Sequence, residues 1–168
     1  MSALKLIIIR HCRTLETDAR IVQGQGWPVR LSLKGKEQAK VLAVLLRQEQ
    51  FEAVYSSDLG RAVETAKIIM RERERPDIVF DSRLREQCFG VYEGGPLITM
   101  IRRMRRMKVG PIDFNPQMGE SAVDFHSRVN NFLGEIKAKH FGKAIVLITH
   151  TNVINIILDK YSRQVLKR

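Results

Sequence analysis

The chain has 168 residues, of which 44% are hydrophobic and 28% are charged, a composition typical of a globular protein rather than a disordered one. Lys and Arg number 29 against 18 Asp and Glu, so the net charge of +11 favours anionic partners. No apolar run approaches the roughly 20 residues that a membrane span needs, and no secretion signal is visible. The two cysteines, Cys12 and Cys88, form neither a disulfide framework nor a zinc ligand set. We therefore expect one cytoplasmic domain over residues 1–168.

Apolar runs alternate with helical stretches along the chain. The expected elements are a strand over 4–9, a loop to residue 32, a helix over 33–50 that Ser32 caps, a strand over 53–57, a helix that Asp58 caps, a strand over 78–80, a loop over 83–96, a helix over 97–108, a loop over 109–119, a helix over 121–140, a strand over 144–149 and a short helix over 153–158. Strands that alternate with helices predict an α/β fold. We expect three α/β/α layers around a mainly parallel sheet.

Polar side chains follow three of the expected strands. Arg10 and His11 follow the first strand, Arg61 lies one turn into the helix after the second, and His150 follows the last. Ligands of open parallel sheets bind at the carboxyl ends of the strands, so these groups would meet there and bind phosphoryl oxygens. Each group alone has a structural alternative. A histidine at a strand end can simply be a satisfied core residue, and Arg61 can pair with a glutamate such as Glu64.

The order of these motifs resembles the histidine phosphatase superfamily, which has the phosphoglycerate mutase-like fold. The similar segments are Arg10-His11-Cys12-Arg13-Thr14, residues 55–66, residues 84–94, Gly119-Glu120-Ser121 and Leu147-Ile148-Thr149-His150. Cys12 stands where the family has Gly, and Thr151-Asn152 stand where it usually has two glycines. These departures concern substrate positioning more than phosphoryl chemistry.

The resemblance implies a mechanism with a phosphohistidine intermediate. His11 would attack phosphorus, while Arg10, Arg61 and His150 would hold the phosphoryl oxygens. Glu86 would protonate the leaving oxygen and then activate water. The alternative for Glu86 is a loop carboxylate paired with Arg83 or Arg85. The substrate contacts that we expect come from Thr14, Gln23, Gly24, Arg83 and Thr151. No metal and no cofactor are expected.

Residues 95–118 correspond to the family's variable insert. The segment Ile101–Lys108 places apolar residues on one helical face and arginines on the other. Three interpretations of the basic face stay open: a solvated face, a lid that draws in an anionic substrate, and a surface for nucleic acid or phospholipid. We consider nucleic acid and membrane partners disfavoured.

Members of the family usually continue beyond the position that corresponds to Arg168, into a further strand of the sheet. The sequence therefore predicts a fold that is short at its C-terminus. Either the fold is trimmed there, or a sheet edge is left open and is covered by a second copy. Because an open edge invites strand pairing, it favours a homodimer.

The implied function is a metal-independent phosphomonoester hydrolase that acts on a small phosphorylated metabolite through a phosphohistidine. Candidate substrates include a sugar phosphate and a nucleotide-pathway ester such as α-ribazole phosphate. The alternatives are phosphoryl transfer of the phosphoglycerate mutase type, a phosphoprotein phosphatase, and a weakly catalytic anion-binding protein on the same fold.

Overall fold

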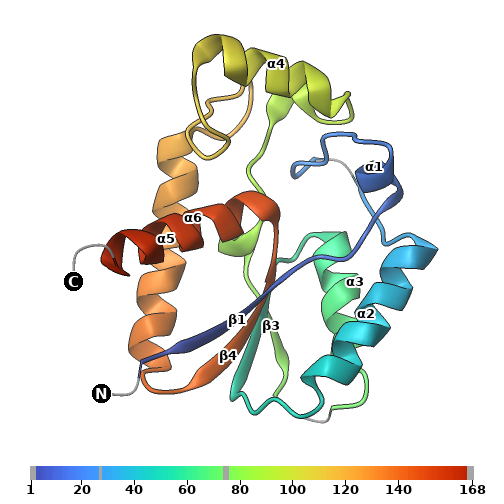
Figure 1. Ribbon diagram of the computed structural model, residues 1–168, viewed down its shortest axis with the longest axis vertical. Coiled ribbons are helices and arrows are strands. Elements are labelled where there is room, and N and C mark those ends of the chain that lie inside the picture. The colour runs from blue at the N-terminus through green and yellow to red at the C-terminus, as the bar shows by residue number, and fades with distance from the viewer. Residues whose placement is uncertain (1–2, 27, 74–75, 166–168) are drawn as a thin grey trace.

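The computed structural model describes residues 3–26, 28–73 and 76–165 (Figure 1). The remaining residues of the expected domain 1–168 lie outside the described residues. The strands are β1 (Lys5–Arg10), β2 (Ala53–Ser56), β3 (Ile78–Phe80) and β4 (Ala144–Thr149). The helices are α1 (Leu15–Asp18), α2 (Leu33–Leu46), α3 (Gly60–Ile69), α4 (Leu97–Met107), α5 (Ala122–Lys139) and α6 (Thr151–Val165), with short 3₁₀ turns η1 (Ser82–Leu84) and η2 (Gly90–Tyr92).

The four strands form one parallel sheet in the order β1-β4-β2-β3. Leu147 of β4 lies opposite Ile8 on one side and Tyr55 on the other. The predicted parallel sheet is thus confirmed. Because all four strands run in one direction, their carboxyl ends lie along one edge, and Arg10, Ser56 and Thr149 are the last residues of β1, β2 and β4.

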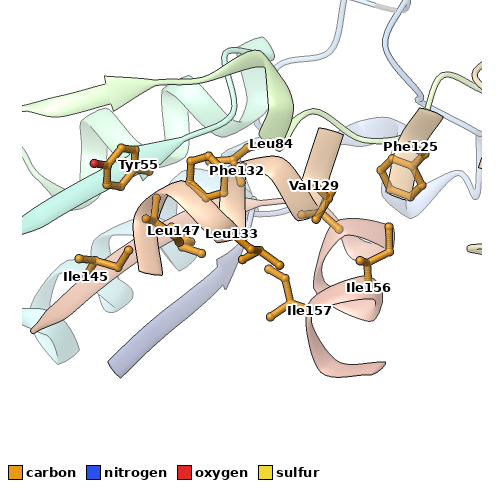
Figure 2. Close-up of a cluster of buried hydrophobic side chains, with 12 residues drawn as sticks. Tyr55, Leu84, Phe125, Val129, Phe132, Leu133, Ile145, Leu147, Ile156 and Ile157 are labelled. Carbon is orange, nitrogen blue, oxygen red and sulfur yellow. The ribbon is translucent and has the colours of Figure 1, made fainter. Parts of the chain in front are cut away.

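Helices cover both faces of this sheet, as the sequence predicts. Side chains alternate between the faces, so Ile145 and Leu147 pack toward α5 and α6, whereas Val146 and Ile148 pack toward α2 and α3. Figure 2 shows the first of these clusters, in which Phe132 and Leu133 of α5 lie beside Tyr55 and Leu147 of the sheet. All four β4 residues from 145 to 148 are fully buried, which explains the unbroken apolar run there.

Several expected boundaries change in the structure. Ser32 does cap α2, where its Oγ accepts a 3.1 Å hydrogen bond from the Gly35 backbone N–H. The predicted Asp58 cap of α3 is wrong. Leu59 occupies that position, and the Asp58 carboxylate instead accepts two hydrogen bonds from the Arg85 guanidinium. The last helix is longer than the expected 153–158, because it also includes Thr151, Asn152 and residues beyond 158.

The β1 strand has one neighbour, β4, among the described strands. Its other edge is unpaired within the described ranges. The homodimer that this edge favours stays a prediction. Among the described helices, none is long and apolar enough to span a membrane.

Candidate active site

A cavity of about 380 Å³ opens at the carboxyl ends of the strands. Its lining includes Arg10, His11, Arg61 and Glu86, four of the five groups to which the resemblance gives catalytic roles. A second hollow, of about 780 Å³, runs along α2 and shares Arg10 and His11 with the first. Neither Arg61 nor Glu86 is among the residues described around this second hollow, so the smaller cavity is the candidate active site.

His11 follows β1 directly and is 7% exposed. Its Nδ1 lies 2.9 Å from the backbone carbonyl oxygen of Cys12. A carbonyl oxygen only accepts, so Nδ1 carries the ring proton and Nε2 is an unprotonated acceptor. Burial lowers the pKa of His11 to about 3, and the positive charge of Arg61 adds to this effect. His11 is therefore a neutral imidazole, with Nε2 unprotonated, at neutral pH.

Arg61 lies in the first turn of α3 and is 2% exposed. Its Nε donates to His11 Nε2 over 3.3 Å, and its Nη2 donates to the Gly24 carbonyl oxygen over 2.8 Å. Burial lowers the pKa of Arg61 to about 10, while the negative charge of Glu86 opposes this effect. At neutral pH the guanidinium stays charged, and it is not paired with Glu64, which instead binds the Leu31 backbone N–H and Lys36.

Glu86 follows η1 and is almost fully buried. One carboxylate oxygen accepts a hydrogen bond from the Gln87 backbone N–H at 3.0 Å, and the other accepts one from the Asn152 backbone N–H at 3.4 Å. Burial raises the pKa of Glu86 above its ordinary value. The alternative pairing with Arg83 or Arg85 is absent from the described contacts, since those arginines bind other carboxylates.

His150 follows β4 and is completely buried behind His11, with the two ring centroids 5.1 Å apart. Its Nε2 lies 2.8 Å from Ser57 Oγ, which already accepts a hydrogen bond from the Leu59 backbone N–H. The Ser57 hydroxyl is able to donate to Nε2, and in that arrangement the ring proton of His150 lies on Nδ1. That Nδ1 has no hydrogen-bond partner among the described residues. Burial lowers the pKa of His150 well below its ordinary value.

The five expected substrate-contact residues divide into two groups. Gln23, Gly24 and Thr151 line the cavity, and Gln23 Oε1 is buried without a hydrogen-bond partner in the described part of the chain. Thr14 is fully buried, and its Oγ1 caps α1 by accepting from the Thr17 backbone N–H. Arg83 does not reach the cavity.

The expectation for Arg83 needs correction. Its guanidinium binds the carboxylate of Asp81 and, over 2.8 Å, that of Glu135 on α5. It also lies over the Phe132 ring, at 5.3 Å from the ring centroid. These contacts hold the side chain against α5, away from the residues that line the cavity.

Two residues that support the site were not singled out from the sequence. Glu93 accepts hydrogen bonds from the backbone N–H groups of Gln25, Gly26 and Phe89. Because Gly24 has a φ of +50° and a Cβ there would overlap the Glu93 carboxylate, only glycine fits this turn. Glu93 lies in the segment 84–94 that carries the resemblance, so a signal for it existed.

The second supporting residue is Arg128 of α5. Its guanidinium donates to the backbone carbonyl oxygens of Arg83, Arg85 and Glu86 and binds both carboxylate oxygens of Glu120. Nothing in the sequence around Arg128 distinguishes it from the other arginines of the chain. Within the described ranges, no group of three or more His, Cys, Asp or Glu residues is arranged to hold a metal ion.

Comparison with known proteins gives one consistent result. The family model described as "Histidine phosphatase superfamily (branch 1)" matches residues 6–167. Phosphoserine phosphatase 1 of Hydrogenobacter thermophilus is 31% identical over 152 residues, covering 88% of this chain and 71% of the relative. The mouse fructose-2,6-bisphosphatase TIGAR is 34% identical over 86% of this chain, which spans about half of that longer protein (55%).

Solved structures agree with this result. Bacillus stearothermophilus YhfR superposes with a TM-score of 0.83 and 31% identity, over 96% of this chain and 81% of the other. A putative α-ribazole-5'-P phosphatase from Escherichia coli gives a TM-score of 0.79 with 27% identity, over 94% and 79% of the two chains. The expected phosphoglycerate mutase-like fold is confirmed by these matches.

Proposed function

Because the chain belongs to the histidine phosphatase superfamily, its enzyme class is a phosphatase, and we propose that it hydrolyses phosphomonoesters without a metal through a phosphohistidine on His11. One observation carries this proposal. An unprotonated imidazole nitrogen, a buried arginine and a buried carboxyl group line the same cavity.

The first step forms a bond between His11 Nε2 and phosphorus and breaks the bond between phosphorus and the ester oxygen. Nε2 carries no proton because the ring proton lies on Nδ1 and points at the Cys12 carbonyl oxygen. In this step the Nε2 lone pair exchanges its 3.3 Å hydrogen bond from Arg61 Nε for the bond to phosphorus. Glu86 donates its proton to the leaving oxygen, so the alcohol departs neutral. The raised pKa of Glu86 supports this role, because the carboxyl group keeps its proton at a higher pH than an exposed one.

The second step returns the enzyme to its starting state. The ionised Glu86 takes a proton from water, whose oxygen attacks the phosphohistidine, and the bond between His11 Nε2 and phosphorus breaks. Inorganic phosphate leaves, while the neutral imidazole and the protonated carboxyl group are restored. No proton or electron is gained or lost over the cycle.

The phosphoryl oxygens need donors in both steps. We assign them to the Arg10 and Arg61 guanidinium groups and to the unpaired Nδ1–H of His150. Losing one donor of this kind typically costs on the order of 100-fold in rate. Thr151 and Gln23 at the cavity wall are assigned to contacts with the rest of the substrate.

The substrate in this proposal is a small phosphorylated metabolite. Relatives named for phosphoserine, fructose 2,6-bisphosphate and α-ribazole phosphate all fit that description. We further propose a cytoplasmic location, which the two free thiols Cys12 and Cys88 support, and a homodimer formed through the open β1 edge.

The test is hydrolysis of p-nitrophenyl phosphate in EDTA, with the His11→Ala variant as the comparison. We expect turnover by the wild-type enzyme and none by the variant, together with an acid-labile phosphoryl group on the wild-type protein after rapid quenching. His126→Ala, at a half-buried histidine of α5 that is not among the described cavity-lining residues, is the matched control and should keep full activity. Activity that disappears on chelation, or that survives in His11→Ala, would rule the mechanism out.

A further inference from the structure

The cavity has two chemically different halves. Its polar half holds the phosphoryl chemistry described above. The other half is apolar and is built by α4 together with residues from two other segments. The apolar residues that the argument uses are Val22, Phe89, Leu97, Met100, Ile101 and Met104.

This apolar wall is a packed structure rather than a scatter of surface side chains. Val22, Phe89, Met100 and Met104 are all less than 9% exposed and belong to one hydrophobic cluster. Leu97 and Ile101 pack against the same cluster. In Figure 1, α4 lies beyond the carboxyl ends of the strands.

Charged groups are scarce on this wall. Of the described lining residues, Glu86 is the one carboxylate, and it already has its role with the leaving oxygen. Arg20 is the one cationic residue there beyond Arg10 and Arg61. The α4 residues that line the cavity are all apolar, whereas the four arginines of α4 are exposed.

The arrangement of charged and apolar residues around the cavity favours some leaving alcohols of the substrate over others. An ammonium group on the alcohol would find no carboxylate of its own in the described lining. A second phosphate would find Arg20 as the one further cation, beside uncharged polar side chains such as Gln23 and Thr151. A leaving group without charges would bury its carbon surface against the wall, which stabilises the complex in proportion to the area removed from water.

We propose that the substrate is a phosphomonoester of an apolar alcohol, alkyl or aromatic, rather than a phosphorylated amino acid or a sugar bisphosphate. This inference rests on the proposed function for its catalytic half. The apolar face of α4 thus binds the leaving group, and its basic face plays no part in that contact.

The test uses straight-chain alkyl phosphates from ethyl to octyl, below their micelle concentrations, with glycerol phosphate and phosphoserine as polar counterparts. The alkyl alcohols differ little as leaving groups, so differences in kcat/KM measure the contact of the alkyl chain with the apolar wall. We expect kcat/KM to rise with chain length, by up to about fourfold for each methylene that is buried. The polar esters should fall below the butyl ester.

Two matched variants locate the effect. Ile101→Thr shortens an apolar side chain on the wall, whereas Ile98→Thr makes the same change on the same helix at a residue that is 49% exposed. Ile101→Thr should flatten the dependence on chain length, and Ile98→Thr should leave it unchanged. Binding of the matching alkylphosphonates, measured by calorimetry, gives a readout that needs no turnover.

The outcomes separate the two proposals. Hydrolysis that is indifferent to chain length, or that favours the polar esters, overturns the inference and leaves the proposed function intact. If no ester is hydrolysed, including p-nitrophenyl phosphate, but phosphonate affinity rises with chain length, the proposed function fails and the ligand class stands. Phosphonate binding that ignores chain length contradicts the inference in either case.

Discussion

Arg128 donates a 3.0 Å hydrogen bond to the backbone carbonyl oxygen of Glu86, so a residue of α5 holds the segment that carries the buried carboxyl group. The same guanidinium binds the carbonyl oxygens of Arg83 and Arg85 at 2.7 and 2.8 Å. Its charge is balanced by Glu120, whose carboxylate oxygens lie 2.6 and 2.8 Å away. One side chain of α5 therefore contributes three of the hydrogen bonds that hold this irregular loop in position.

Replacing Arg128 should lower the catalytic rate although Arg128 is not among the described residues that line the cavity. In Arg128→Met, three carbonyl oxygens and the Glu120 carboxylate lose their hydrogen bonds to the guanidinium, so we expect kcat/KM to fall by about 10- to 100-fold. The free energy of unfolding should drop by about 1–3 kcal/mol. Steady-state kinetics over a pH range and urea unfolding measure the two effects.

The double variant Arg128→Met/Glu120→Gln separates positioning from stability. Removing the unpaired carboxylate should restore part of the lost stability, but it should not restore kcat/KM. A positioning role also predicts a shift of the basic limb of the pH profile, because the surroundings of Glu86 change. Full activity in Arg128→Met would contradict this role.

Glu93 supports the other side of the cavity. It accepts hydrogen bonds of 3.0, 2.6 and 2.7 Å from the backbone N–H groups of Gln25, Gly26 and Phe89. The turn that it holds presents the Gly24 carbonyl oxygen to Arg61. In Glu93→Gln one acceptor oxygen becomes a donor, so we expect roughly a tenfold loss of kcat/KM through poorer placement of Arg61.

The matched control for Glu93 is Glu37→Gln, which removes a carboxylate whose described partner is the neighbouring Lys40 on the surface. That variant should keep wild-type kinetics within error. Glu93→Gln kinetics that match those of the control would show that the turn holds its shape without the carboxylate.

The pH dependence of the rate should come mainly from Glu86. Because the pKa of His11 is lowered to about 3, the nucleophile is neutral over the whole range from pH 4 upward. The raised pKa of Glu86 means that its carboxyl group is protonated below that value and ionised above it. With an alkyl phosphate, kcat/KM should therefore fall as the pH rises through the pKa of Glu86.

Glu86→Gln checks this assignment. We expect a loss of about 100- to 10,000-fold with an alkyl phosphate, and a smaller loss in the first step with p-nitrophenyl phosphate, whose leaving group needs little protonation. Since the same carboxylate activates water, the phosphohistidine should accumulate in the variant. A basic limb that persists in Glu86→Gln would point to another titrating group.

Much of this architecture follows from the sequence, for a physical reason. The run Ile145–Ile148 is fully buried and apolar because helices cover both faces of the sheet. An apolar run of this kind predicts a central strand, and His150 follows the end of that strand. The two histidines come within 5.1 Å because β1 and β4 are neighbours in the sheet, and this strand order does not follow from the order of the strands along the chain. The N-cap at Ser32 could also be predicted from the sequence, because it depends on residues that are adjacent in the chain.

Side-chain partners distant in sequence could not be predicted. Arg83 pairs with Glu135, 52 positions away, and Asp58 pairs with Arg85 rather than with its own helix. Nothing local distinguishes these pairs from the other combinations that a chain with 29 Lys and Arg offers. The apolar face of residues 97–107 was readable from its period, but the cavity that it lines is formed only when the fold brings Val22 and Phe89 beside it.

Acid should destabilise the fold partly through His11. The unfolded chain protonates this histidine near pH 6.5, whereas burial lowers its folded pKa to about 3, so the unfolded state binds the extra proton between these values. Stability is thus lost as the pH falls from 6.5, with a contribution from His11 of about 1.4 kcal/mol per pH unit near pH 5. In His11→Gln the slope of unfolding free energy against pH should decrease by about that amount, measured by urea unfolding in phosphate-free buffer. Phosphate must be excluded because an anion bound in the cavity would stabilise the folded state and hide the change. An unchanged slope would mean that His11 takes up its proton in the folded enzyme, and the neutral nucleophile would lose its structural basis.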